Sequence, residues 1–177
     1  MKMIAALVAI TLTASPAIDS ATATELRSES SQTSNPQIDY PGFLKLTGEI
    51  AKYREARLVT LEAFNKISLK TDAIILDTRS AAAFRQGHIE GAINLPFSDF
   101  TAEKLAEYLG DQDRPILIYC NNNFRNDIAP VVRKAAPLAL NIPTFINLYG
   151  YGYQNIYELN DVISMTDPRI RWVSDSL

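Results

Sequence analysis

Residues 115–126 read PILIYCNNNFRN and contain the only cysteine of the chain, Cys120. The apolar run 116–119 is typical of a strand buried on both faces, and a short polar loop follows it. Residues 126–140 then carry apolar positions at helical spacing, which predicts a helix. A thiol between a strand and a helix faces loop N–H groups and a helix N-terminus, which stabilise its thiolate. We therefore predict a reactive thiol at Cys120, although a lone cysteine is more often a small buried apolar residue.

The rest of the chain alternates short apolar runs with segments at helical spacing. We predict strands at 58–60, 73–77, 91–96, 116–119 and 145–148, and helices at 61–68, 80–86, from 98 or 101 to 109, at 126–140, and ending near 159. Residues 167–173 are expected to be extended and to pack through Trp172. This alternation predicts an α/β fold, a small doubly wound parallel sheet with helices on both faces. Ligands of such sheets bind beyond the carboxyl ends of strands, where Asp77 and Cys120 lie.

The first 39 residues are not expected to belong to this fold. Residues 1–23 combine Lys2, an apolar run at 3–12 too short to span a bilayer, and small residues that fit a cleavage site. This pattern predicts a secretory signal peptide, with an uncleaved membrane anchor as the alternative. Residues 24–39 are polar and aperiodic, which predicts a flexible linker before a domain at 40–177 with its core at about 58–159. We expect a periplasmic or secreted protein with no stable membrane anchor after processing.

Composition argues against several classes of function. A net charge of −3 without a Lys/Arg cluster argues against a nucleic-acid-binding surface. One cysteine cannot form an internal disulfide, so an exported lone thiol is either buried and inert or kept for its chemistry. No group of His, Cys and acidic residues has metal-ligand spacing, so we expect neither a metal nor another cofactor.

Three stretches resemble the signatures of rhodanese-like domains. They are ILDTR at 75–79, GHIEGAINLP at 87–96 and LYGYG at 148–152, and Cys120 closes a strand as the family's active cysteine does. The resemblance covers about residues 58–159. It implies a small doubly wound α/β domain and sulfurtransferase chemistry, in which the cysteine takes a sulfane sulfur as a persulfide and passes it to a thiophilic acceptor.

The resemblance gives structural roles to four residues of the signature stretches. Asp77 and Arg79 are expected to form an ion pair at a strand end. Ala83 replaces an acid common in the family, so Arg79 is expected to find a further partner. His88, the only histidine, is expected in a structural turn together with Gly91 rather than as a general base.

The loop length separates two related chemistries. Cys120 to Arg125 form C-x4-R, one residue shorter than the H-C-x5-R loop of the dual-specificity phosphatases that share this fold. Tyr119 stands in the place of their histidine. The resemblance therefore favours a loop that holds a sulfane sulfur over one that holds a phosphate, and a phosphate-ester hydrolase is the weakest alternative.

Roles follow for the other loop residues. The backbone N–H groups of Asn121, Asn122 and Asn123 are expected to cradle the persulfide. Asn123 stands where many active relatives have glycine, and asparagine tolerates the left-handed conformation better than other residues. Phe124 either walls the pocket or packs against the sheet. Arg125 is either a solvated charge or an anion contact that lowers the thiol pKa and binds an anionic donor.

Two hypotheses of function follow. The first is an exported single-domain sulfurtransferase that uses a thiosulfate or polysulfide type donor and a thiol acceptor. The second is a catalytically silent binding or redox-sensing module on the same scaffold. It is motivated by the missing glycine, the asparagine run, and Pro130 and Pro137 in the predicted helix. The sequence identifies no protein partner.

Overall fold

The structure is a computed structural model that describes residues 37–70, 72–126 and 128–174. The predicted signal peptide and most of the predicted linker lie outside the described residues. The folded unit begins at Tyr40, the first residue of a helix. Within the described ranges, no helix is both long enough and apolar enough to cross a membrane.

Five parallel strands form the central sheet of the described chain. Their order is β1 (Leu58–Val59), β6 (Ile156–Leu159), β5 (Ile116–Tyr119), β2 (Ile74–Asp77) and β4 (Ala92–Asn94). Strands β2 and β5 are buried along their whole length, as their apolar runs predict. Their register sets Asp77 opposite Tyr119, so their carboxyl ends meet at one edge of the sheet.

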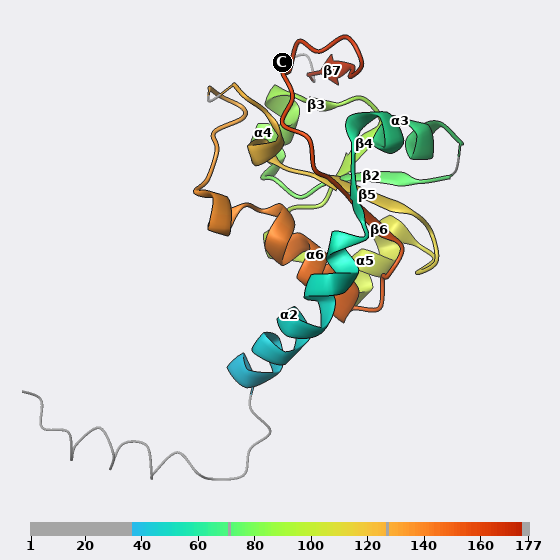
Figure 1. Ribbon diagram of the computed structural model, residues 1–177, viewed down its shortest axis with the longest axis vertical. Helices are drawn as coiled ribbons and strands as arrows, with labels where there is room; N and C mark the ends of the chain where they lie inside the picture. The colour runs from blue at the N-terminus through green and yellow to red at the C-terminus, as the bar shows by residue number, and fades with distance from the viewer. Residues whose placement is uncertain (1–36, 71, 127, 175–177) are drawn as a thin grey trace, which may run out of the picture. The chain divides into compact units, whose positions relative to one another are not determined.

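Helices cover both faces of this sheet (Figure 1). The helices are α2 (Tyr40–Glu55), α3 (Leu61–Lys70), α4 (Ala81–Gln86), α5 (Ala102–Leu109) and α6 (Asn141–Gly150). On one face, Ile50, Leu105 and Phe145 of α2, α5 and α6 share a buried apolar cluster. On the other face, Phe64 of α3 packs in a second cluster that also contains Trp172. The predicted doubly wound α/β fold is confirmed.

The C-terminal tail adds a second, smaller sheet. Strand β7 (Trp172–Val173) pairs antiparallel with β3 (His88–Ile89). The expectation that the tail packs through Trp172 is confirmed, but the tail is extended only at β7, because residues 167–170 form a turn closed by the Ile170 N–H on the Asp167 carbonyl.

Three predicted elements between residues 126 and 159 are wrong. No α-helix occupies 126–140; outside Asp127, which is not described, the segment is a loop that contains a turn at 129–130 and one short 3-10 helix, η3 (Ala136–Leu138). Pro130 and Pro137 lack the backbone N–H that a helix interior requires. Residues 145–148, predicted as a strand, lie in α6, and residues 156–159, predicted as the end of a helix, form β6.

The burial pattern explains the two exchanged elements. The α6 residues Asn141, Thr144, Phe145 and Leu148 are buried at helical spacing, which outweighs their strand-like composition. In β6, the buried Glu158 interrupts an otherwise apolar strand. It is satisfied there by Arg54, whose Nη2 lies 2.6 Å from its Oε1.

Candidate active site

Cys120 follows β5 directly and is 1% exposed. It caps a short turn, η2 (Asn121–Asn123), and the backbone N–H groups of Asn141, Asn122 and Leu140 favour its thiolate. Two of these groups lie at the start of α6. The thiol therefore meets a helix N-terminus, as predicted, but this helix is α6 and not one that follows the loop directly.

The net electrostatic effect on the thiol is opposite to the one predicted. Burial raises the pKa of the Cys120 thiol, and the N–H groups of Asn141, Asn122 and Leu140 oppose this rise without overcoming it. The negative charge of Glu158 raises the pKa further. The expected lowering of the thiol pKa is wrong, because desolvation is the largest contribution.

Asn123 is the centre of the loop's hydrogen bonds. Its Oδ1 accepts from the Cys120 backbone N–H at 2.9 Å and from Asn141 Nδ2 at 3.1 Å. Its Nδ2 donates to the carbonyl oxygens of Leu159 at 2.6 Å and Asp161 at 3.2 Å. No non-glycine residue in the described ranges has a positive φ, so Asn123 does not need the left-handed conformation. It stands at the glycine position because its side chain joins the loop to α6 and to the chain after β6.

Asn121 and Asn122 connect the same loop to the segment that replaces the predicted helix. Asn121 Nδ2 donates to the Val132 carbonyl at 2.8 Å. Asn122 Nδ2 donates to the Lys134 carbonyl at 2.7 Å, and its Oδ1 accepts from the Lys134 N–H at 3.1 Å. The side chains of the asparagine run therefore hold the structure around the thiol, a role that the sequence left open.

The structure separates Arg125 from the pocket that Asn121 lines. Its exposed side chain donates through Nε to the Val162 carbonyl at 3.2 Å. It lines a different pocket of about 350 Å³ together with Asp161 and Arg169. Of the two roles considered for Arg125, the exposed charge is the one that matches its position.

Phe124 is fully buried and packs in the core. Its ring makes edge contacts with Tyr119 at 6.0 Å and Trp172 at 4.9 Å between centroids. Of the two roles considered for Phe124, packing against the sheet is the one observed.

The expected ion pair of Asp77 and Arg79 is present at the end of β2. Arg79 Nη2 lies 2.6 Å from Asp77 Oδ2, and both side chains are buried. The Tyr119 hydroxyl donates to the same carboxylate oxygen at 2.6 Å. Burial raises the pKa of Tyr119 well above its ordinary value, and the charge of Asp77 raises it further.

Arg79 has further partners in place of the acid that Ala83 replaces. Its Nη2 donates to the Gly87 carbonyl at 2.7 Å, and its Nη1 donates to Asn121 Oδ1 at 3.2 Å. The Asn121 contact joins the signature segment to the cysteine loop.

His88 and Gly91 have the structural positions expected of them. The buried His88 ring stacks on Phe84 at 3.6 Å, and its Nδ1 lies 2.8 Å from the Phe84 carbonyl oxygen. Gly91 has a φ of +80°, which favours glycine in the turn before β4.

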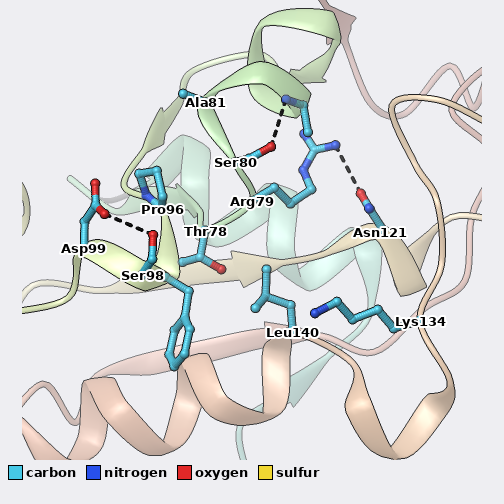
Figure 2. A pocket seen from close by; sticks show the side chains of 12 residues that line it. Thr78, Arg79, Ser80, Ala81, Pro96, Ser98, Asp99, Asn121, Lys134 and Leu140 are labelled. Atoms are coloured by element: carbon cyan, nitrogen blue, oxygen red, sulfur yellow. Dashed lines mark hydrogen bonds between the residues drawn. The ribbon is translucent and has the colours of Figure 1, made fainter.

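A pocket of about 450 Å³ opens at the carboxyl ends of the strands (Figure 2). Among its lining residues are Asn121 and Leu140, which flank the thiol, and Arg79 from the signature. Lys134 and Asp99 also line it, and sequence reasoning singled out neither. Lys134 lies fourteen positions after Cys120 in the chain (134 − 120), so no local motif points to it. In the described part of the chain, no group of three or more His, Cys, Asp or Glu side chains could hold a metal ion.

Comparison with known proteins gives one family. The family model of the rhodanese-like domain matches residues 60–162. The uncharacterized protein YibN of Escherichia coli K12 is 31% identical over 64 residues. That match takes in 36% of this chain and 45% of YibN, so the chain spans less than half the length of this curated relative.

Several solved structures are similar to this chain. The Rhodanese_3-like domain of Alr3790 from Anabaena is 18% identical with a TM-score of 0.42, over 59% of this chain and 94% of that one. Protein hp1203 from Helicobacter pylori is 22% identical with a TM-score of 0.44, over 69% and 93%. A rhodanese with anions from E. coli is 19% identical with a TM-score of 0.39, over 58% and 98%. Because the family model matches more than half of its length, this chain belongs to the rhodanese-like domain family.

Proposed function

We propose that this protein is a sulfurtransferase in which Cys120 carries a sulfane sulfur as a persulfide. The observation that carries the proposal is the set of backbone N–H groups from Asn122, Leu140 and Asn141 that favour negative charge on this one sulfur. Such preformed donors stabilise a thiolate, and the proposal extends this stabilisation to the outer sulfur of a persulfide. Leu140, whose N–H is one of these groups, also lines the pocket of about 450 Å³, although Cys120 itself is not among its lining residues.

The reaction has two displacements. The Cys120 thiolate attacks the outer sulfur of a donor such as thiosulfate, the S–S bond of the donor breaks, and sulfite leaves with the electron pair. The thiolate of an acceptor then attacks the outer sulfur of the persulfide. The bond to Sγ breaks, Cys120 leaves as a thiolate, and the acceptor carries the persulfide. With one cysteine in the chain, the acceptor must be an external thiol or another nucleophile.

Mass spectrometry tests the proposal directly. Protein treated with polysulfide or thiosulfate is expected to gain the mass of one sulfur atom on the peptide that contains Cys120, and to lose it again when a thiol is added. Cys120→Ser is the control and should gain none. If the wild type gains no sulfur from either donor at any pH up to 10, the proposal is wrong.

A second candidate, a catalytically silent binding module, is favoured by one specific observation. Cys120 is 1% exposed behind a loop held by asparagine side chains, and burial raises its thiol pKa. An inert core thiol has the same properties. The module hypothesis predicts no sulfur on Cys120 in the experiment above and equal binding of any partner by Cys120→Ser and wild type.

Export remains part of the proposal, because residues 1–23 have the composition of a signal peptide. The intact mass of the protein recovered from its natural host tests this. Removal of about the first 23 residues is expected, whereas a mass that includes them would contradict export by this route.

A further inference from the structure

A buried acid lies on the same face of the sheet as the Cys120 thiol. Two acidic side chains are buried in the described ranges, Asp77 and Glu158. Glu158 stands opposite Ile118 in the register of β5 and β6, and the extended Cys120 lies two positions beyond Ile118. Because side chains two positions apart in a strand share a face, Glu158 and the thiol both project to the side that α6 covers. The ordinary spacings within and between strands separate their Cα atoms by about 8 Å.

The charge of Glu158 is paired by helix α2. Arg54 donates through Nε to Oε2 at 2.7 Å and through Nη2 to Oε1 at 2.6 Å, a two-point contact that fixes the carboxylate. The Arg54 side chain is 31% exposed and that of Glu158 is 6% exposed, so the pair extends from the sheet toward solvent. Helix α2 packs against α6 (Figure 1) and precedes residues 60–162, which match the family. Membership of the family therefore does not account for this contact.

The other charged groups around Cys120 lie on the opposite face or are exposed. Asp77, Arg79 and Tyr119 form their buried network on the side of α3, where Tyr119 belongs to the apolar cluster. Lys134 and Arg125 are exposed. Helix α6 contains no charged residue, and those of α5, and of α2 apart from the paired arginine, are exposed. The other titratable groups in the cluster on the α6 face are three tyrosines, Tyr53, Tyr149 and Tyr153. The pair between α2 and β6 therefore supplies the buried charges on the thiol's own face.

We propose that Arg54 is a positioning residue for the reaction of Cys120, because it holds and neutralises the Glu158 carboxylate whose charge would otherwise oppose formation of the thiolate. The inference rests on the proposed sulfurtransferase function, in which this thiolate attacks the donor. One negative charge in a poorly solvated interior increases the cost of forming a second one nearby. The electrostatics of the thiol agree, since burial is the main cause of its raised pKa and the charge of Glu158 raises that pKa further. Helix α2 thus belongs to the active site and acts on the thiol through Glu158.

Removal of the two charges one at a time separates an electrostatic role from a structural one. Ionisation of the thiol is followed by the ultraviolet absorbance of the thiolate, and the same titration with Cys120→Ser added to each variant is subtracted to remove the tyrosines. Arg54→Gln leaves Glu158 without its counter-charge and should raise the midpoint by about half a pH unit, the effect expected of one charge at about 8 Å. Glu158→Gln leaves the charge of Arg54 and should lower the midpoint by a similar amount. A structural role alone would move both midpoints in the same direction, because both changes break the same contact, and that result would overturn the inference.

A double variant keeps the test decisive if Arg54→Gln does not fold. Glu158→Gln is expected to fold, because Arg54 is partly exposed and its charge can reach water. The variant that combines Arg54→Gln with Glu158→Gln carries neither charge, so its midpoint should return close to that of wild type. A double variant with a midpoint as low as that of Glu158→Gln would show that loss of the contact, and not charge, causes the shift.

Lys52→Gln and Glu55→Gln are the matched controls, because they make the same charge changes at exposed positions of α2. Neither should move the midpoint, and shifts as large as those of the paired residues would overturn the inference. Arg54→Lys keeps the charge and should keep the wild-type midpoint.

Sulfur loading links the midpoints to the reaction. Below the midpoint the rate of loading from polysulfide follows the thiolate fraction, so Glu158→Gln should load faster and Arg54→Gln slower, each by up to about three-fold. Midpoints that move in opposite directions without these changes in rate would contradict a role of Arg54 in the reaction. Failure of wild type to load sulfur on Cys120 would instead overturn the proposed function itself.

Discussion

The ends of the neighbouring strands β2 and β5 are built in different ways. At the end of β2, Asp77 pairs with Arg79 two positions later, and Ser80 caps the next helix through the Ala83 N–H. At the end of β5, the loop after Cys120 bonds to partners far along the chain. Asn123 reaches Asn141 and Leu159, which are 18 and 36 positions away. The β2 end is satisfied by charge, through a local ion pair to which Tyr119 and Asn121 add long-range hydrogen bonds. The β5 end is satisfied at long range by neutral amides.

This difference decides how each end responds to change. A buried ion pair that loses one partner leaves an uncompensated charge in a low dielectric, and this greatly lowers the free energy of unfolding. A neutral amide that loses its partners leaves unpaired hydrogen-bonding groups, each of which has a smaller cost. We therefore expect the β2 end to dominate stability and the β5 end to control the geometry around the thiol.

The largest effect is expected from Asp77→Asn. The change leaves the buried Arg79 without its carboxylate, and we expect the free energy of unfolding to fall by about 3–5 kcal/mol. Urea denaturation measures it, with an unchanged slope as the sign that the unfolded state is not altered.

The chain contains a matched control for this change. Asp167 and Arg169 repeat the same spacing and geometry at the surface, with Nη2 2.7 Å from Oδ2 and Nε 3.0 Å from Oδ1. Arg169 is exposed, so Asp167→Asn should change stability little. Equal losses in the two variants would show that burial does not distinguish the two pairs.

The next largest effect is expected from Asn123→Ala. It removes the acceptor of the Cys120 N–H and the donor to the Leu159 carbonyl, both within a buried site. We expect a loss of about 3 kcal/mol in urea denaturation. Asn123→Gly restores the residue common in active relatives and should be as damaging, because the side chain and not the backbone conformation is needed. A glycine variant as stable as wild type would contradict this reading of the β5 end.

The same contrast explains which parts of the structure the sequence could predict. The β2 end, its ion pair and the helix that follows it depend on residues a few positions apart, and these were predicted. The start of α5 was predicted at 98 or 101, and the structure caps it at Thr101. The partners of Asn123 depend on how α6 and β6 are placed. Both elements were misassigned, because strand-like residues form α6 and a buried acid interrupts β6. Their true types depend on tertiary packing that a single sequence does not display.

The pocket shows the same limit. Asp77 and Cys120 were predicted at the carboxyl ends of strands, where ligands of parallel sheets bind, and the pocket opens at that edge although neither residue lines it. Lys134 lies in a segment predicted as a helix, so its position could not be inferred. Arg125 follows the loop in sequence and was the natural candidate cation, yet the chain turns there to bond with Val162.

A smaller effect is expected from Asn122→Ala. Its side chain holds the Lys134 backbone through two hydrogen bonds in a half-buried position. We expect a loss of about 1 kcal/mol. Asn155→Ala is the control, since Asn155 Nδ2 makes a comparable long-range bond to the Asp113 carbonyl at 2.8 Å away from the thiol. Asn122→Ala and Asn155→Ala should lower the free energy of unfolding by similar amounts. If Asn122→Ala lowered it as much as Asn123→Ala does, Asn122 would be as important to the loop as Asn123.

The pH dependence of Cys120 reactivity tests the chemistry of the β5 end. Ionisation of this thiol is expected to leave the free energy of unfolding near neutral pH unchanged. Because burial raises the pKa of the thiol in the folded state, its alkylation by iodoacetamide should rise with pH and reach its midpoint above that of the unfolded chain. The sign for stability follows: the folded state holds the proton more tightly, so the thiol's contribution is complete below the unfolded pKa and is lost as pH rises through the folded one. The buried Tyr119 also has a raised pKa and so contributes to the same pH dependence. The difference in free energy of unfolding between wild type and Cys120→Ser, measured in urea at each pH, isolates the contribution of the thiol. A native midpoint below the unfolded one would mean that the N–H groups of α6 and the loop outweigh desolvation.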